Sequence, residues 1–371
     1  MIRLRLIPAL LIIGLAASCA GRGTLTLAPD AAKVGSLEPI LVASSRQRDA
    51  DGPGFGRAPA PGLGFSQITV SVPPDREPGT VTFPSNGTPD PRRDFLTVDS
   101  TRIADRAGFI RAVNAAVATR PRNQREVFVF VHGFNTNFAE GLYRQAQMSH
   151  DFSTPGISVN YAWASAANVT AYATDRETTL QARDDLEQLL DLLAQTDVTR
   201  IVVGGHSMGA FLVMEALRQK AIRNRPGGFD KIRSVILMAP DIDVGVFRRQ
   251  ARALADKDVS IYIFTSARDR ALRASAVLRG SGERLGSLSD PSQLGGLPVT
   301  IIDLTEIDGN GDSLNHFKVA TSPVMISILS GMSAVGTEIL TDETHQSSLL
   351  GAGVTVVQEA AAVVLSPLAA K

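Results

Sequence analysis

Apolar residues along this chain follow two spacings, and from about residue 102 the two spacings alternate. The stretch 102–120 has helical spacing, and an unbroken apolar run that ends in His-Gly, "EVFVFVHG", follows it. The further apolar runs that predict strands are "GISVNYAWAS", "RIVVGGHS", "SVILMAP", "VSIYIFTSA" and "LPVTIIDL". The clearest helical stripe between them consists of Leu180, Leu186, Leu189, Leu190 and Leu193. Continuous apolar strands that alternate with helices are typical of a parallel sheet covered on both faces. Residues 125–335 are therefore predicted to form one doubly wound α/β domain.

The segments on either side of this domain have a different pattern. Residues 19–38 lack periodicity and predict a tether. Residues 39–124 contain a short strand, "EPILVASS", and an alternating segment that ends on prolines, "FSQITVSVPP", as an edge strand does. The Gly- and Pro-rich stretches around them predict loops, so we expect a strand-and-loop extension that packs on the domain. The tail, residues 336–371, is apolar but interrupted by two polar residues, which favours a docking helix over a membrane span.

The first residues of the chain read as a targeting segment. Arg3 and Arg5 precede a short apolar run and small residues, which predicts a signal peptide over residues 1–18. "AASC" resembles the lipobox of bacterial lipoproteins, although Ala16 stands where leucine is more usual. The resemblance implies a lipid anchor on Cys19 and a protein exported to the bacterial cell envelope. The alternative is cleavage at another alanine, which leaves a periplasmic protein without the anchor.

The residue that follows Cys19 bears on which membrane holds the anchor. Ala20 stands there instead of the aspartate that signals retention in the inner membrane, and this favours the outer membrane. Cys19 is also the only cysteine of the chain, so an internal disulfide is excluded.

Composition narrows the class of partner. The 371 residues include 37 basic and 37 acidic side chains, so the net charge is zero and no basic surface for nucleic acid is expected. Aromatic residues make up 5% of the chain, which also argues against a base-stacking surface. An ordinary globular protein with a small-molecule substrate fits these values better.

The candidate nucleophile is Ser207. Residues 205–209, Gly-His-Ser-Met-Gly, match the pattern G-x-S-x-G and lie between a predicted strand and a predicted helix. Such a turn strains the serine backbone and exposes the hydroxyl. We expect Gly205 and Gly209 to give the serine steric clearance. The alternative is a structural strand-to-helix turn with an incidental serine.

A serine hydroxyl needs a base, and the chain has five histidines. His206 lies inside the turn with its side chain pointing away, and His132 and His150 precede the turn. His316 follows the predicted strand "VTIIDL" at the edge where Ser207 is expected, so it is the predicted base. A solvated loop histidine is the alternative reading of His316. The fifth, in the polar stretch "TDETHQSS", lies beyond the predicted sheet.

The base in turn needs a carboxylate to orient it. Asp269 follows the apolar strand before the one that leads to His316, and we predict it to be that acid. Asp241 and Asp243, in "APDID", are the alternative acids. Helix capping is the other role open to this pair, because aspartate at a helix start is favourable.

An oxyanion needs two N–H donors. The backbone amide of Met208 is one candidate, and the amide of Phe134, after the close turn at Gly133, is the other. The stretch 308–313, "DGNGDS", lacks the glycine and glutamate of a calcium loop, so no metal or cofactor is predicted. Residues 270–297 are rich in Gly and Ser. Three interpretations of this segment remain: a pocket wall, a mobile lid or a surface loop.

Several motifs together resemble one family, the DUF900 branch of the α/β-hydrolase superfamily, whose members are esterase/lipase-like hydrolases of unknown function. The motifs are "VFVHGFNTNF", "YAWAS" with Tyr172 and Asp175 downstream, "GGHSMGA", "MAPDID", "SARDRAL" and the lead-in "ILVASSR". Ala164 stands where this branch usually has proline, and Asn-His-Phe surrounds His316 where the branch more often has His-Ser-Tyr. The resemblance implies an α/β-hydrolase fold and a triad of Ser207, Asp269 and His316.

These observations lead to one functional expectation. The chain is expected to be a serine hydrolase that cleaves carboxylic esters through an acyl-enzyme, with a small-molecule ester as substrate. An acyltransferase or a thioesterase with the same triad is an alternative. A non-catalytic lipoprotein binding module on a hydrolase fold is another.

Overall fold

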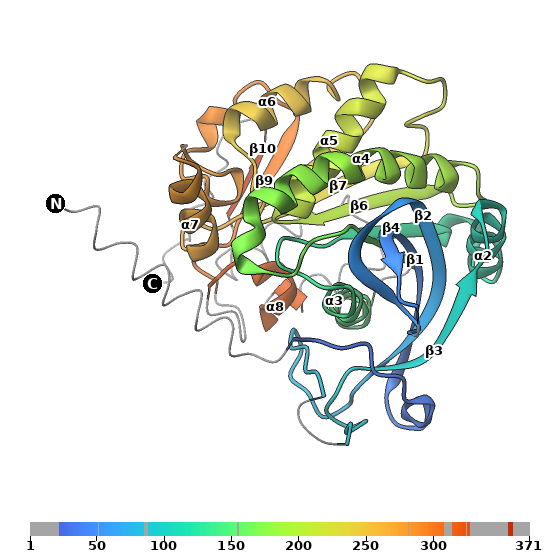
Figure 1. Ribbon diagram of the computed structural model, residues 1–371. Coiled ribbons are helices and arrows are strands. Elements are labelled where there is room, and N and C mark those ends of the chain that lie inside the picture. Colours follow the sequence, from blue (N-terminus) through green and yellow to red (C-terminus); the bar gives the residue numbers. More distant parts are fainter. Residues whose placement is uncertain are drawn as a thin grey trace, which may run out of the picture.

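One sheet runs through the described part of the molecule. The computed structural model describes residues 22–326, apart from 51, 85–87, 154–155, 281, 308–313 and 324, and residues 355–358. Within these ranges the sheet has ten strands in the order β10-β9-β8-β7-β6-β4-β5-β1-β2-β3 (Figure 1). All neighbours from β9 to β1 are parallel, and antiparallel pairs lie only at the two ends. This confirms the predicted, mostly parallel α/β sheet.

The strands and helices have the following bounds. The strands are β1 Ser36–Arg48, β2 Phe55–Val72, β3 Leu96–Ile103, β4 Glu126–Val131, β5 Ile157–Ala162, β6 Arg200–His206, β7 Ile232–Met238, β8 Ser260–Thr265, β9 Val299–Asp303 and β10 Thr355–Gln358. The helices are α2 Arg106–Ala118, α3 Phe138–Asp151, α4 Tyr172–Ala194, α5 Met208–Arg223, α6 Val244–Arg252, α7 Arg270–Arg279 and α8 Lys318–Thr321. Short 3-10 helices span Pro29–Lys33, Arg122–Gln124, Val169–Ala171, Leu285–Ser287 and Pro291–Leu294.

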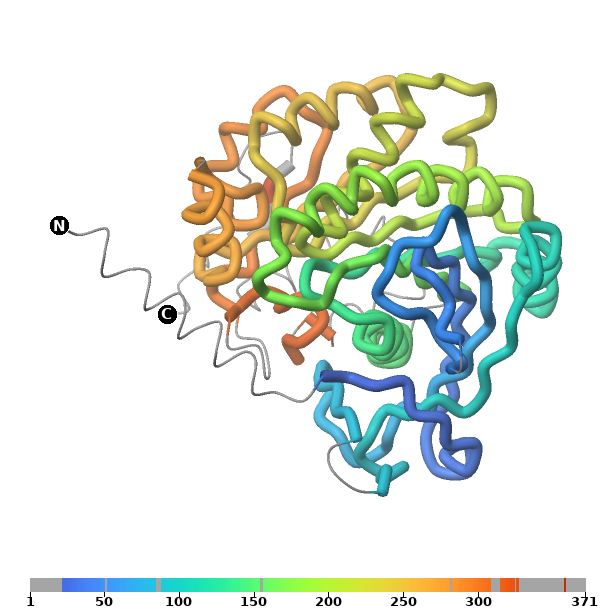
Figure 2. The backbone as a smooth tube through the Cα atoms, in the orientation of Figure 1, coloured from blue at the N-terminus to red at the C-terminus, as the bar shows by residue number. Residues whose placement is uncertain are grey.

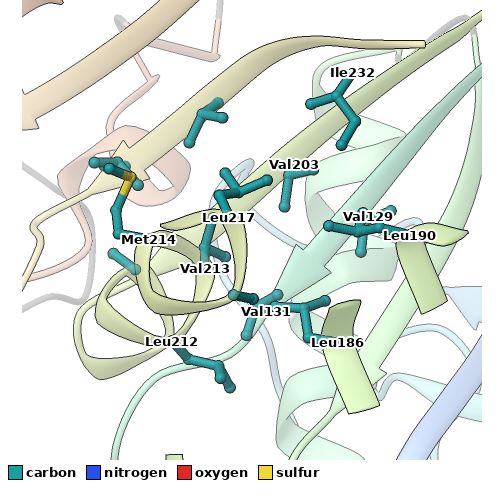
Figure 3. Close-up of a cluster of buried hydrophobic side chains, with 14 of the residues drawn as sticks. Val129, Val131, Leu186, Leu190, Val203, Leu212, Val213, Met214, Leu217 and Ile232 are labelled. Atoms are coloured by element: carbon teal, nitrogen blue, oxygen red, sulfur yellow. The ribbon is translucent and has the colours of Figure 1, made fainter. Parts of the chain in front are cut away.

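Helices cover both faces of the sheet. Helices α2, α4, α5 and α6 share one apolar cluster with the sheet, and α3 and α8 contribute to the clusters on the other face. Successive residues of a strand point to opposite faces, so β4 sends Val129 and Val131 to the first face and Phe130 to the second. Figure 3 shows the first cluster, where side chains of α4 and α5 meet β4 and β6. The continuous apolar runs in the sequence therefore correspond to strands that are buried on both faces of the sheet.

The N-terminal extension differs from the prediction, because its strands belong to the same sheet. Strand β1 pairs in parallel with β5, so the extension lengthens the sheet at one end (Figure 2). The segment "FSQITVSVPP" was expected at an edge, but it is part of β2 and lies between β1 and β3. The Pro-rich stretch expected as a loop continues the β1–β2 pairing, with two irregularities of register. The edge strand, β3, has no clear pattern in the sequence.

The predicted tether is also corrected for its described part. The backbone of residues 26–28 pairs with Thr97 of β3, and Ala31 is fully buried. The amide of Thr26 donates to the hydroxyl of Tyr143 on α3 at 3.2 Å. An aperiodic segment can still bury itself by pairing its backbone with an open strand edge, and here it covers part of the edge of β3.

The two chain ends lie largely outside the described residues. The predicted signal peptide and Cys19 fall there, as does most of the predicted C-terminal helix. Residues 355–358 of that tail form strand β10, which pairs antiparallel with β9, so this part of the helix prediction is wrong. Three of its four residues, Thr355, Val356 and Val357, are β-branched, which favours a strand at the edge of β9. In the described part of the chain, no helix combines the length and the apolar character needed to cross a bilayer.

Candidate active site

The turn at Ser207 is strained, as the sequence predicts. Strand β6 ends at His206, α5 begins at Met208, and Ser207 between them has φ 53° and ψ −118°. A positive φ is costly for a residue with a side chain. The amide of Ser207 donates to the carbonyl of Met238 at 2.9 Å, and its carbonyl accepts from the amide of Asp241 at 3.2 Å. The end of β7 therefore holds the strained peptide on both sides.

The glycines around Ser207 have a different role from the expected one. A Cβ on Gly205 would lie 2.7 Å from the Cα of Ala210, and a Cβ on Gly209 would lie 2.3 Å from the carbonyl oxygen of His132. Both glycines therefore permit contact between backbones, namely α5 on β6 and α5 on the end of β4. The residue that approaches the serine is Gly133, where a Cβ would lie 3.1 Å from the Cβ of Ser207.

The structure brings Asp269 and His316 together. Asp269 follows β8 and is fully buried, and His316 lies in the loop after β9 with a side chain that is 17% exposed. Nδ1 of His316 is 2.7 Å from Oδ2 of Asp269, and Oδ1 of Asp269 accepts from the amide of Leu272 to cap α7. The helix cap thus fixes the rotamer of the carboxylate. With Nδ1–H directed at Asp269, the neutral imidazole carries its lone pair on Nε2.

His206 connects the turn to the loop of His316. Its Nε2 donates to the backbone carbonyl of His316 at 3.1 Å, and its ring lies 4.7 Å from the His316 ring and 4.1 Å from the ring of Phe317. Burial, with a smaller effect of His316, holds the pKa of His206 well below its ordinary value. His206 is therefore a neutral side chain that supports the position of His316.

The two alternative acids lie elsewhere. The buried carboxylate of Asp241 accepts hydrogen bonds from Tyr172 Oη at 2.5 Å and Ser275 Oγ at 2.8 Å, and it lies 3.3 Å from Arg284 Nε. Asp243 caps α6 by accepting from the amide of Val246 at 3.1 Å. Asp241 therefore joins α4, α7 and the end of β7, and Asp243 has the capping role that the sequence left open.

The loop between β4 and α3, residues 132–136, places Phe134 next to the turn. Gly133 provides the close approach to Ser207, and the ring of Phe134 packs edge-on against the ring of Tyr172 at 5.3 Å. Asn135 has a φ of 53°, so this loop, like the turn at Ser207, contains a left-handed residue. Met208 is the first residue of α5, and its amide belongs to the first turn, where the helix itself offers no acceptor.

Sequence reasoning missed a group of buried polar residues under this loop. His132 is buried, stacks on the ring of Trp163 at 5.2 Å, and directs Nδ1 at the carbonyl of Gly133 at 3.0 Å. Nη2 of Arg46, which comes from β1, lies 3.4 Å from Nε2 of His132. Burial and, to a lesser degree, Arg46 lower the pKa of His132 to about 3. The available signal was a charged residue at the end of an apolar strand, in "ILVASSR".

The remaining predictions concern the surroundings of the site. Residues 270–280 and 282–297 form α7 and two 3-10 helices, and Leu272, Leu285, Leu288 and Leu294 are buried, so this segment is no plain surface loop. A small hollow adjoins His316, and its lining includes Met238, Phe264, Leu304 and Val319. Among the described residues no group of three potential ligands is arranged to hold a metal ion. The turn 308–313 lies outside them.

Replacing Gly209 tests the contact between α5 and β4. The added methyl of Gly209→Ala would meet backbone oxygens of Val131 and His132 at 2.4 and 2.3 Å, so the helix must shift. We expect a loss of about 1–3 kcal/mol in the free energy of unfolding, measured in urea. In the control Gly62→Ala the methyl meets no atom within 4 Å, and the loss should stay below about 0.5 kcal/mol. Equal losses in the two variants would contradict this contact.

The buried, neutral His132 predicts loss of stability in acid. Its pKa is about 3 in the folded protein, so between this value and its ordinary value of 6.5 only the unfolded chain takes up the proton. The free energy of unfolding therefore falls as the pH decreases through this window, by about 2 kcal/mol from pH 7 to pH 5 on account of His132. Urea unfolding of His132→Gln should show a correspondingly smaller decrease. An unchanged decrease in His132→Gln would refute the assignment.

Comparison with known proteins agrees with this architecture. The Ser…Asp…His order and the serine on a strand-to-helix turn are those of the α/β-hydrolase fold. Residues 110–332 match the family described as "Alpha/beta hydrolase of unknown function (DUF900)". No curated protein matches the chain significantly.

Similar solved structures are remote. They include a structure from an analysis of two fungal esterases from Rhizomucor miehei, at 13% identity and a TM-score of 0.37, with 86% of this chain and 86% of that chain covered. Aspergillus fumigatus lipase B has 13% identity and a TM-score of 0.34, with 63% of this chain and 58% of that chain covered. An extracellular α/β-hydrolase from a Paenibacillus species has 14% identity and a TM-score of 0.22, with 32% and 41% covered. The chain thus spans less than two thirds of the length of the lipase and of the Paenibacillus hydrolase. The family match, in contrast, covers more than half of the chain, and the chain therefore belongs to the DUF900 family of alpha/beta hydrolases of unknown function.

Proposed function

We propose that the protein is a serine hydrolase that cleaves carboxylic esters through an acyl-enzyme on Ser207. The observation that carries the proposal is the hydrogen bond between His316 Nδ1 and the fully buried Asp269, 2.7 Å long. It lies in the loops at the carboxyl edge of the sheet that also bears the strained Ser207. A buried carboxylate that accepts from an imidazole fixes its tautomer and stabilises the imidazolium that forms during the reaction.

In the first half of the reaction Ser207 Oγ attacks the ester carbonyl carbon and transfers its proton to Nε2 of His316. The carbonyl oxygen becomes an oxyanion, which the amides of Met208 and Phe134 stabilise. When this intermediate collapses, the bond to the alcohol oxygen breaks, and the alcohol leaves with the proton from His316. The acyl group remains on Ser207.

In the second half, water attacks the acyl-enzyme with His316 as base, and the carboxylic acid and free Ser207 are regenerated. Asp269 keeps its negative charge throughout and pairs with the imidazolium. His206 supports the geometry, since it holds the backbone of His316 from the residue beside Ser207.

Labelling with a fluorophosphonate probe tests the nucleophile. We expect one adduct, located on Ser207 by peptide mass spectrometry, and no adduct in Ser207→Ala. His316→Ala should lower kcat/KM for p-nitrophenyl esters by roughly 10³-fold or more, because the serine loses its base. An adduct on another residue, or full labelling of His316→Ala, would refute the triad.

The role of Asp269 as the acid can be tested with Asp243 as a matched control, because each of the two aspartates caps a helix. Asparagine also caps helices well, so Asp269→Asn and Asp243→Asn should both retain most of their stability. Only Asp269→Asn removes the charge beside His316, and we expect its kcat to fall by roughly 10⁴-fold, as for this change in a serine-protease triad. Steady-state kinetics of both variants give the answer, and equal kcat values would contradict the role of Asp269.

We also propose that Cys19 carries a lipid anchor in the cell envelope, with the outer membrane favoured. The proposal rests on the sequence "AASC" after an apolar run. Arg22 already bonds to Asn135 and Glu140, so the link from anchor to fold spans three residues, at most about 11 Å. Mass spectrometry of the mature N-terminus should find acyl groups on Cys19 and none in Cys19→Ser. An unmodified N-terminal peptide that begins after Cys19 would exclude the anchor.

A further inference from the structure

A buried arginine from the N-terminal extension lies under the loop that carries Phe134. Arg46, near the end of β1, is 1% exposed. Its Nη2 donates to the carbonyl of Thr136 at 2.9 Å and lies 3.4 Å from Nε2 of His132. A single nitrogen therefore contacts both ends of the loop 132–136. Nη1 donates to the carbonyls of Ser165 at 3.2 Å and Gly56 at 3.1 Å, which fixes the guanidinium from below.

We propose that Arg46 is a positioning residue of the active site, which holds the loop 132–136 so that the amide of Phe134 faces the reacting carbonyl. The kinetic part of this inference rests on the proposed hydrolase function. The positional part concerns the loop itself and is measurable without any substrate.

Burying the charged guanidinium of Arg46 costs free energy, and the packing of the side chain alone does not explain why a cation stands here. Burial lowers the pKa of Arg46 to about 10, so the side chain is still a cation at neutral pH. The acidic group that most favours its charged form is the buried Asp175, whose own carboxylate accepts from Ser165 Oγ at 2.6 Å and the amide of Ala166 at 2.8 Å. An apolar side chain in such a position is often as stable or more so. The planar guanidinium, in contrast, places several donors in fixed directions, so it can hold the loop 132–136 in one conformation.

The loop has a conformation that needs external support. Asn135 is left-handed, with φ 53°, directly after Phe134. Arg22 donates to its side-chain oxygen and to its carbonyl, each at 3.0 Å, and pairs with Glu140 at 2.6 Å. Arg22 thus holds the exposed side of the loop while Arg46 holds the buried side. Both arginines precede the predicted α/β domain, so the N-terminal segment completes the active site.

Arg46→Met and Arg48→Met form the test pair. Methionine keeps the apolar stem of arginine and removes the donors. Arg48 lies two residues further on the same strand, stacks on Phe55 and bonds to Phe65 and Ser66 of β2, so its loss perturbs the extension without touching the loop. We expect Arg46→Met to lower kcat by about 10- to 100-fold with KM within about twofold, because an oxyanion donor acts mainly in the transition state. Arg48→Met should change neither value by more than about twofold.

Arg46→Lys refines the kinetic test. Lysine keeps the charge but has one nitrogen in place of the fork, so it should recover only part of the lost kcat. Full recovery would assign the effect to charge alone and contradict the role of the fork.

Trp163 provides a readout that is independent of activity. It is the only tryptophan of the chain, is fully buried, stacks on His132 and donates from Nε1 to the carbonyl of His132 at 2.7 Å. If Arg46 holds the loop, Arg46→Met should shift the Trp163 emission to the red and increase its quenching by acrylamide. Arg48→Met should leave both as in the wild type, and thermal melting shows that each variant is folded.

The outcomes separate the two proposals. If the wild-type protein neither labels on Ser207 nor hydrolyses esters, the proposed function fails, and the Trp163 emission still decides whether Arg46 holds the loop. If the wild-type protein is active and Arg46→Met matches Arg48→Met in kcat and in Trp163 emission, the positioning role of Arg46 is refuted. If both variants lose kcat equally, the effect belongs to the extension as a whole, which also refutes it.

Discussion

The geometry of this site depends on one strained peptide, the left-handed Ser207 between β6 and α5. Its φ of 53° is sustained because neighbouring backbone surrounds it. The end of β7 bonds to both its amide and its carbonyl. The first turn of α5 sits directly on the last residues of β4, where Gly209 leaves no space for a side chain. Contacts from β7 and from the end of β4 thus hold the strained peptide at the end of β6, and Gly133 of the loop 132–136 lies against the serine.

Burial divides the histidines around the turn into two kinds. His132 and His206 are held neutral by burial, and each touches a backbone carbonyl of a loop that borders the site. His316 keeps a partly exposed side chain and a charged partner, Asp269, which is itself fully buried. In the proposed mechanism, this difference in environment distinguishes His316, the proton carrier, from His132 and His206, which support the two loops. His206 is the neighbour of Ser207 in the sequence, but its burial makes it less suitable than His316 as the proposed base.

Local pattern was sufficient for much of the fold and of the candidate site. Continuous apolar runs between helical stripes predict the parallel sheet, and the glycines around Ser207 predict the turn, because both signals act over a few residues. In the structure Asp269 contacts His316, whereas Asp241 contacts Tyr172. The two were nevertheless equivalent in local sequence, since each follows a buried strand, and only the loop that carries His316 separates them.

The features that sequence missed depend on pairing between distant segments. The continuation of β1 and β2 through the stretch 46–64, the edge strand β3 and the aperiodic residues 22–35 acquire their structure from partners across the sheet. Arg46 is another feature of this kind. A single arginine at a strand end does not indicate a role, because the loop 132–136 that it contacts lies 86 or more residues further along the chain. The pattern of residues along the chain does not show which distant segments are in contact.

The most direct test of the central claim, that Ser207 carries the acyl group, is to trap this intermediate. The protein is mixed rapidly with p-nitrophenyl acetate, quenched in acid within the first turnover, digested and examined by mass spectrometry. The account predicts one acetyl group on the peptide that contains Ser207, formed together with a burst of p-nitrophenol close to the enzyme concentration. Ester turnover at an unchanged rate in Ser207→Ala, with no acetyl group on this peptide in the wild type, would contradict it.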